Sequence, residues 1–145
     1  MPSPSGESAF FILHPSSFIL LLMKSALILF AHGARDPEWA APFRKIQSTV
    51  AGRCPGLSVE LAFLEFIPPA LADAVEALAR AGHGTITVAP LFMAQGGHLK
   101  RDLPLLLEDL RRRFPAVTLT LLPPIGEVSP VLDAISDWLV NSTPR

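Results

Sequence analysis

The sequence is poor in charge and contains one cysteine, and both shortages narrow what the protein can be. Charged residues make up 17% of the 145 residues and the formal net charge is −1, which excludes a broadly basic surface for nucleic acid. Half of the residues are hydrophobic, which excludes a disordered chain. Cys54 has no second cysteine for an internal disulfide, as suits a cytoplasmic protein. We expect it to be a small, partly buried apolar residue.

The first 22 residues differ in character from the rest of the chain. They contain the apolar stretch AFFILHPSSFILLL, but HPSS interrupts it and no basic residue precedes it. A membrane span needs about 20 unbroken apolar residues and a signal peptide opens with positive charge, so neither is expected. We interpret residues 1–22, which include His14, as an extension upstream of a natural start at Met23 with no role in the fold. Residues 23–145 are expected to form a single domain.

From Ser25 onward, short apolar runs alternate with segments of helical pattern. Strands are predicted at 25–31, 57–65, 84–91 and 116–122, and helices at 37–53, 68–81, 103–114 and 129–140. This alternation predicts an α/β fold, a doubly wound four-stranded parallel sheet with helices on both faces. Trp138 lies on an apolar stripe of the last helix and is expected to pack against the domain.

Three residues that can bind a metal lie where predicted strands end. His32 follows the first strand, Glu65 is the last residue of the second, and His98 lies in the loop after the third. Ligands of open parallel sheets bind outside the carboxyl ends of the strands. If the first strand lies between the other two, the strand ends are about 4.8 Å apart and the three side chains can converge. Two imidazoles and a carboxylate suit a divalent transition metal with coordination positions left open.

Each of these residues also has a simpler interpretation. His32 suits a turn, Glu65 suits a solvated strand end, and His98 suits the cap of the next helix. Their shared position at one edge of the sheet favours a common site. His83 precedes the third strand, so it belongs at the opposite edge and is expected to be a turn residue.

Basic residues accompany the histidines in the sequence. Arg35, Lys100 and Arg101 lie in or just after the same loops and can contact carboxylates of a ligand. Arg44 and Lys45 are expected to lie in solvent instead. Arg35 and Arg101 are the better candidates for such contacts, because they flank the histidines.

The chain contains four segments in a characteristic order within residues 25–139: AHGARDP, VELAFLE, VAPLFMAQGGH and RDLP. With them the sequence resembles the small sirohydrochlorin chelatases of the class II chelatase superfamily, which have a doubly wound α/β fold. The resemblance implies that His32, His98 and Glu65 are the metal-binding and catalytic residues. The chain departs from many members at Ala34, where they have serine. That change removes a hydroxyl near the ligand and leaves the metal-binding residues in place.

The resemblance also implies a reaction, the insertion of Co²⁺, Fe²⁺ or Ni²⁺ into sirohydrochlorin, a tetrapyrrole rimmed with carboxylates. The metal is then a substrate, and no organic cofactor is expected. Arg35, Lys100 and Arg101 would bind the carboxylates of the tetrapyrrole. A neutral histidine would accept a pyrrolic proton, while Glu65 would assist metal binding or relay protons. Cobalt for cobalamin is the first expectation, and iron for siroheme is the second.

The resemblance also bears on partners. The family includes long members in which two such domains face one cleft, so a single domain offers one wall to a flat macrocycle and a homodimer is expected to supply the other. No nucleic acid or membrane partner is expected. A metal or tetrapyrrole carrier without catalysis is the main alternative. A flavodoxin-like or receiver-like module is disfavoured, because AHGARDP offers neither a Ser/Thr-rich phosphate loop nor the aspartates of a receiver.

Overall fold

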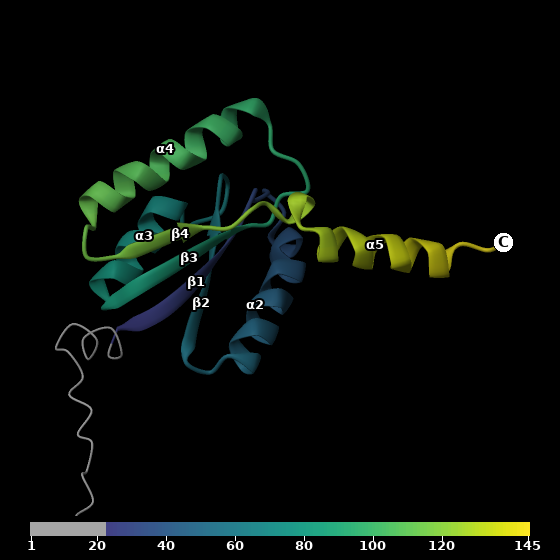
Figure 1. Cartoon of the computed structure of the whole chain (residues 1–145), viewed down its shortest axis with the longest axis horizontal. Coiled ribbons are helices and arrows are strands. Elements are labelled where there is room, and N and C mark those ends of the chain that lie inside the picture. Colours follow the sequence, from purple (N-terminus) through teal and green to yellow (C-terminus); the bar gives the residue numbers. More distant parts are fainter. Residues whose placement is uncertain (1–22) are drawn as a thin grey trace, which may run out of the picture.

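A single parallel sheet organises the chain. The computed structural model describes residues 23–145, so the predictions for residues 1–22, His14 included, lie outside the described residues. The strands are β1 (Lys24–Ala31), β2 (Leu57–Phe63), β3 (His83–Pro90) and β4 (Thr118–Leu121). They pair in the order β2-β1-β3-β4, all parallel (Figure 1). The first strand lies between the second and third, which is the condition for their carboxyl ends to be neighbours, and every strand boundary falls within two residues of the predicted one.

Helices cover both faces of this sheet, as predicted. The short helix η1 (Pro37–Ala40) and α2 (Ala41–Arg53) pack on the face that carries Ala31 and Phe63. The helices α3 (Leu71–Arg80) and α4 (Gly97–Arg113) pack on the opposite face. Figure 1 shows α2 and α4 on opposite sides of the strands. The alternation of strand and helix in the sequence therefore produces the doubly wound fold that it predicts.

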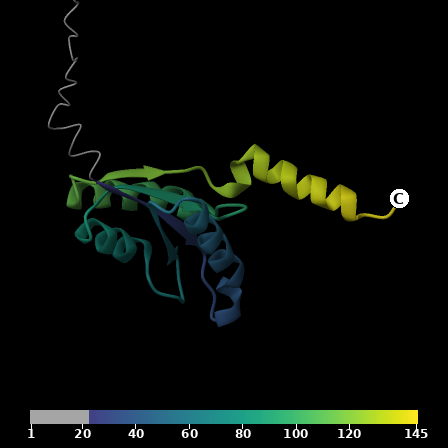
Figure 2. The same ribbon diagram turned by 90° about the horizontal axis from the view of Figure 1, so that it is seen from below.

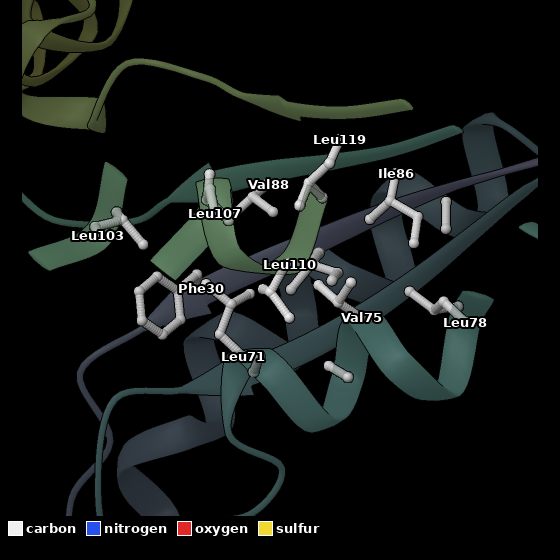
Figure 3. Close-up of a cluster of buried hydrophobic side chains, with 14 of the residues drawn as sticks. Phe30, Leu71, Val75, Leu78, Ile86, Val88, Leu103, Leu107, Leu110 and Leu119 are labelled. Atoms are coloured by element: carbon white, nitrogen blue, oxygen red, sulfur yellow. The ribbon is translucent and has the colours of Figure 1, made fainter. Parts of the chain in front are cut away.

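The main core lies between the sheet and the α3/α4 layer. Alternate strand residues point into it, because successive side chains of a strand face opposite sides. The helices contribute residues three and four apart. Figure 3 shows these contacts, which include Phe30, Ile86, Val88, Leu71, Val75, Leu78, Leu103, Leu107, Leu110 and Leu119. Full burial of each such side chain contributes about 1.5–3 kcal/mol, so this layer supplies most of the stability of the domain.

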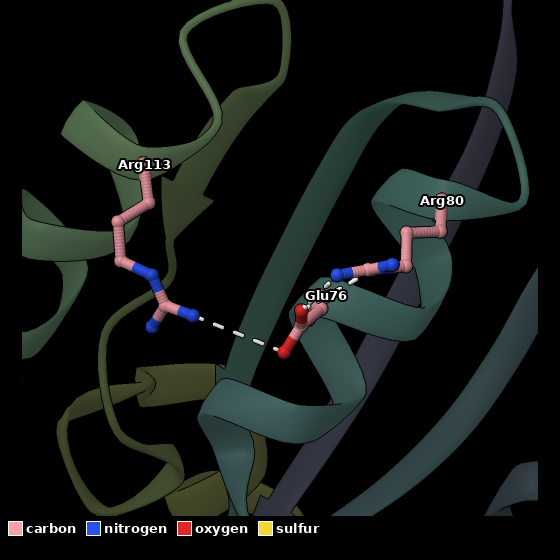
Figure 4. Close-up of polar contacts among 3 residues, drawn as sticks. All are labelled: Glu76, Arg80 and Arg113. Atoms are coloured by element: carbon pink, nitrogen blue, oxygen red, sulfur yellow. Dashed lines mark hydrogen bonds and ion pairs between the residues drawn. The ribbon is translucent and has the colours of Figure 1, made fainter.

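Polar contacts join α3 and α4 at the end of the core away from the carboxyl edge. The carboxylate of Glu76 lies 2.7 Å from the guanidinium of Arg80, one turn further along α3. Its other oxygen lies 3.8 Å from the guanidinium of Arg113, at the end of α4 (Figure 4). These side chains are partly exposed, so each pair contributes at most about 1 kcal/mol. Of the two pairs, the one between Glu76 and Arg113 joins α3 to α4.

The start of α4 differs from the prediction. The predicted helix begins at residue 103, which would place Pro104 in its first turn, where proline is tolerated. The structure begins the helix at Gly97 and continues it through Pro104. Proline at this position removes one backbone donor and crowds the preceding turn, a cost that the buried Leu103 and Leu107 offset. His98 is consequently a residue of the first helical turn and not of a loop.

The last helix, α5 (Ser129–Ser142), projects away from the domain (Figures 1 and 2). None of its residues is buried, and Trp138 is 65% exposed. The prediction that Trp138 packs against the domain is therefore wrong for this chain. The preceding short helix η2 (Ile125–Glu127) sets the direction of α5. It is fixed by Gly126, whose N–H donates to the Phe92 carbonyl at 3.1 Å and whose missing Cβ would overlap the Met93 carbonyl.

Two smaller expectations also change. Cys54 is exposed and not partly buried; it directly follows α2, and its N–H donates to the Val50 carbonyl at 2.9 Å. His83 does lie at the edge opposite His32, but it is a buried strand residue and not a turn residue. Its Nδ1 lies 3.0 Å from the Leu78 carbonyl and its Nε2 lies 2.8 Å from the Ser58 hydroxyl. A carbonyl only accepts, so Nδ1–H donates to it, and the histidine joins α3 to β2.

Within residues 23–145, no helix has the length and apolar character that crossing a membrane requires.

Candidate functional site at the carboxyl edge of the sheet

His32 is positioned by the end of β1. It directly follows the buried Ala31, and its ring packs edge-on against Phe92 with 4.4 Å between ring centroids. Phe92 is itself 1% exposed and packs against Phe30. A buried aromatic side chain thus supports one face of the imidazole, while His32 as a whole remains exposed. The arrangement fixes the ring and leaves it accessible to a ligand.

Glu65 lies beside His32 through backbone pairing. The strand β2 ends at Phe63, two residues earlier than the prediction that made Glu65 its last residue. Pairing nevertheless continues, because the Glu65 N–H donates to the His32 carbonyl at 3.0 Å. Gly33 permits this approach. It has φ +87°, and a Cβ there would overlap the Glu65 carbonyl oxygen. Glycine after His32 is therefore a requirement of the site's backbone.

His98 reaches the same edge from the first turn of α4. Its Nδ1 lies 3.2 Å from Nη2 of Arg101, one turn further along the helix. The Nε of Arg101 also donates to the Gly97 carbonyl at 3.2 Å. A guanidinium only donates, so Nδ1 of His98 is the acceptor in this contact. The proton of the neutral ring then resides on Nε2.

The two histidines line one cavity of about 310 Å³. Its other lining residues are Leu64, Gly96, Leu99 and Asp102. The structure thus brings His32 and His98 together, as the sequence predicts, whereas Glu65 is not among the lining residues. No three His, Cys, Asp or Glu side chains within residues 23–145 are arranged to hold a metal ion. In the described residues, two histidines share a cavity, and Glu65 is joined to His32 by a backbone hydrogen bond.

Asp102 is the cavity residue that the sequence analysis missed. It lies four residues after His98 and therefore on the same face of α4. That spacing was a usable signal, but a helix predicted to begin at residue 103 leaves Asp102 outside it. A carboxylate is therefore present in the histidine cavity, supplied by α4 and not by the loop after β2.

The predicted carboxylate-binding residues separate into different surroundings. Arg101 contacts His98, as described above. Arg35 places its guanidinium 5.1 Å from the ring centroid of Phe66, a residue with φ 66° in the loop after β2. Lys100 lines a second cavity of about 310 Å³, together with Gln95, Leu121 and Glu127 among others. Arg44 and Lys45 are exposed on α2, as expected. The three predicted cations thus lie in three different environments.

Exposed apolar side chains lie in the loops at this edge. Leu64 is 45% exposed, and Phe66 and Met93 are each 55% exposed. Leu64 and Phe66 follow β2 in the segment that also carries Glu65, and Met93 lies in the segment that joins β3 to α4, the helix of His98. Large apolar residues in water near imidazoles and guanidinium groups suit a flat ligand with an apolar face and an acidic rim.

The fold and the cavity define a doubly wound α/β domain with a ligand site beyond the strand ends, in the position where such domains bind ligands. The CbiX family model matches residues 26–141, and the chain belongs to that family. This membership confirms the resemblance to sirohydrochlorin chelatases noted from the sequence.

Two curated relatives are both named sirohydrochlorin cobaltochelatase. The chain is 37% identical over 82 residues to the sirohydrochlorin cobaltochelatase of Methanopyrus kandleri, and the alignment covers 57% of each protein. The chain thus matches little more than half of that relative's length. It is 36% identical over 100 residues to the sirohydrochlorin cobaltochelatase of Sulfurisphaera tokodaii, which covers 69% of this chain and 78% of the relative.

Solved structures share the fold. A protein from Marinobacter aquaeolei VT8, provisionally described as a cobalamin (vitamin B12) biosynthesis CbiX protein, matches with a TM-score of 0.69 and 32% identity. That match covers 81% of this chain and 95% of the other. The sirohydrochlorin chelatase SirB from Bacillus subtilis subspecies spizizenii, solved in complex with cobalt, matches with a TM-score of 0.68. At 24% identity over 83% of this chain and 51% of SirB, it supports the fold alone.

Proposed function

We propose that this protein is a sirohydrochlorin metal chelatase, which inserts a divalent metal ion into the ring of a carboxylate-rimmed tetrapyrrole. The observation that carries the proposal is the cavity shared by His32 and His98 at the carboxyl edge of the sheet. Membership of the CbiX family and the names of the relatives from Methanopyrus kandleri and Sulfurisphaera tokodaii support it. Metal and tetrapyrrole are both substrates in this reaction.

Metal insertion requires that the ion lose water, reach the ring nitrogens and replace two pyrrolic protons. Imidazole nitrogens bind borderline divalent ions, so His32 and His98 are proposed to hold the metal. A neutral imidazole can also accept a proton near neutral pH, and one of the two is proposed to take a pyrrolic proton. Glu65, held beside His32 by the backbone hydrogen bond, is proposed to assist metal binding or relay protons. The buried ring of Phe92 orients His32 for either role.

Binding of the tetrapyrrole is assigned to the cations and apolar residues around the cavity. Arg35, Lys100 and Arg101 are proposed to bind its carboxylates, for which guanidinium groups provide paired donors. The exposed rings and aliphatic chains of Leu64, Phe66 and Met93 would cover part of its apolar face. The separation of the cations suits a ligand whose carboxylates are spread around a rim.

Co²⁺ is the proposed metal, which would place the protein in cobalamin synthesis. Fe²⁺ for siroheme and Ni²⁺ are the other candidates. The names of the two relatives specify cobalt, and SirB structures contain cobalt or Fe³⁺. A site of two histidines and a carboxylate binds divalent ions in their general affinity order. The supply of metal in the cell is therefore proposed to decide which ion is inserted. The reaction is proposed to take place in the cytoplasm.

A homodimer is proposed as the working form. Two surfaces of the described chain support it. The apolar residues of α5 lie in water, with Leu139 51% and Val140 53% exposed. The face of β4 opposite the core also lacks a covering helix, since Thr118 and Thr120 are exposed. A second copy would cover such surfaces and provide a second wall for the macrocycle.

The test of the function is an absorbance assay of Co²⁺ insertion into sirohydrochlorin by the full chain. A chelatase accelerates the change over the rate without protein, whereas a carrier binds and gives no acceleration. His98→Ala should abolish the acceleration with unchanged circular dichroism. His83→Ala is the matched control. It should lose stability, because His83 is buried and hydrogen-bonded, yet the folded fraction should retain normal insertion kinetics.

A further inference from the structure

We propose that Arg101 is a positioning residue that keeps His98 inactive until a carboxylate of the tetrapyrrole draws the guanidinium away. The inference rests on the proposed function and adds an order of binding to it, with the tetrapyrrole first and the metal second. It is carried by the contact between Nη2 of Arg101 and Nδ1 of His98, 3.2 Å apart.

The contact leaves neither ring nitrogen of His98 available. A guanidinium stays protonated and only donates, so it occupies the lone pair of Nδ1. In the neutral ring Nε2 then carries the proton and has no lone pair to offer. Binding a metal ion and accepting a pyrrolic proton both need a free lone pair on an imidazole nitrogen. His98 can therefore do neither while the contact persists.

The charge of Arg101 acts in the same direction. A cation in hydrogen-bond contact with the imidazole repels an approaching divalent ion. His32 shows the contrast, because the described contact of its ring is with Phe92, an uncharged side chain. The two imidazoles of the cavity thus have different contacts. Only for His98 is availability to a metal ion proposed to depend on a third residue, Arg101.

A carboxylate is the group that would release the contact. The present acceptors of Arg101 are an uncharged imidazole and the Gly97 carbonyl. A carboxylate can accept two parallel hydrogen bonds from one guanidinium and adds the attraction of opposite charges, which an imidazole or a carbonyl lacks. Arg101 is exposed, so it can rotate without opening the core. Arrival of the acidic rim would thus exchange the partner of Arg101 and free Nδ1 of His98.

The first experiment measures Co²⁺ binding to the full chain, without tetrapyrrole, by isothermal titration calorimetry. Arg101→Met removes the charge and the hydrogen bond but keeps an aliphatic side chain. It should bind Co²⁺ about 3-fold to 10-fold more tightly than wild type, through loss of the repulsion and release of the lone pair. Lys45→Met is the matched control. It removes an exposed charge on α2 that does not line the histidine cavity, and its affinity should stay within about twofold of wild type.

A second experiment tests whether the effect of Arg101→Met acts through His98. In a His98→Ala protein, adding Arg101→Met should no longer tighten Co²⁺ binding, because the gain acts through His98. The same Arg101→Met change should raise the KM for sirohydrochlorin in the insertion assay, since a carboxylate contact is lost. A residue with only a structural role would not give these opposite effects on the two substrates.

The release step is tested by ¹⁵N NMR of the histidine rings with metal-free uroporphyrin as the probe. Addition of this octacarboxylate to wild type should move the Nδ1 resonance of His98 toward its position in Arg101→Met. An unmoved resonance would overturn the release step. Equal or weaker Co²⁺ binding by folded Arg101→Met, including undetectable binding by both proteins, would overturn the whole proposal. Failure of the proposed function gives a different result, namely no insertion by wild type whatever the affinities are.

Discussion

The helices α4 and α5 share several general sequence features but have opposite relationships to the sheet. Both follow a strand and an irregular segment, both contain a proline, and both carry apolar residues at helical spacing. In α4 these residues include Leu103, Leu107 and Leu110, all buried in the main core. In α5 none is buried. Amphipathic spacing therefore predicts that a helix has a contact face, but not which surface covers it.

The difference arises in the connections. The loop after β3 returns α4 across the sheet, where it packs beside α3. The segment after β4 is held by η2, whose Gly126 is hydrogen-bonded to the Phe92 carbonyl, and α5 continues outward from there. As a result α4 brings His98, Arg101 and Asp102 to the cavity region, whereas α5 exposes an apolar surface, which the proposed homodimer would cover.

The largest effect on stability is expected from the buried helix. Leu107→Ala should lower the free energy of unfolding by about 2–5 kcal/mol, because it removes a fully buried side chain and leaves a cavity. Leu132→Ala, at a 36% exposed site of α5, should change it by less than about 0.5 kcal/mol in dilute protein. Urea unfolding measures both. Comparable losses from the two substitutions in dilute protein would mean that α5 packs on its own domain.

A second prediction concerns assembly. Trp138→Asp places a charge on the exposed apolar surface of α5 and should weaken dimerisation at least about tenfold, as loss of a buried aromatic anchor does at interfaces. Sedimentation velocity over a range of concentrations measures the change. Thr49→Asp on α2, an exposed site of similar charge change, is the control. Wild-type protein that remains monomeric while fully active would refute the assignment of α5 to assembly.

The smallest expected effect comes from a comparison of one carboxylate of α4 with one of α5. Asp102→Asn should raise the KM for Co²⁺ about 2-fold to 5-fold, since it removes a negative charge from the histidine cavity and so weakens attraction of the ion. Asp137→Asn, on the exposed α5, should leave this KM unchanged. Steady-state kinetics with varied Co²⁺ measure both variants. An equal response at the two positions would show that only net charge matters.

The sequence predicted the sheet well because its signals are local. Continuous or alternating apolar runs produced β1 to β4, and alternation of strand and helix required parallel pairing. The same logic brought His32 and His98 to one edge, since the ends of parallel strands coincide. Glu65 was placed beside His32 for the same reason, and the backbone pairing after β2 supports it.

The missed features depend on tertiary contacts. The helix was predicted to begin at residue 103, whereas it begins at Gly97, and the burial of Leu103 and Leu107 offsets the cost of Pro104 inside it. Asp102 was missed as a consequence. The exposure of Trp138 follows from how η2 is anchored, which no periodicity reveals. The contact between Arg101 and His98 requires side-chain conformations that sequence spacing permits but does not specify.

The central claim is that His32 and His98 act together on one metal ion, and a double-mutant comparison of insertion rates tests it most directly. Stopped-flow absorbance would follow Co²⁺ insertion into sirohydrochlorin by His32→Ala, His98→Ala and the protein with both changes. Groups that act as a unit give strongly non-additive losses. We predict that the double variant is about as slow as either single variant, each reduced at least about 100-fold. Single losses that multiply in the double variant would contradict the account, because they would mean that the two histidines act independently.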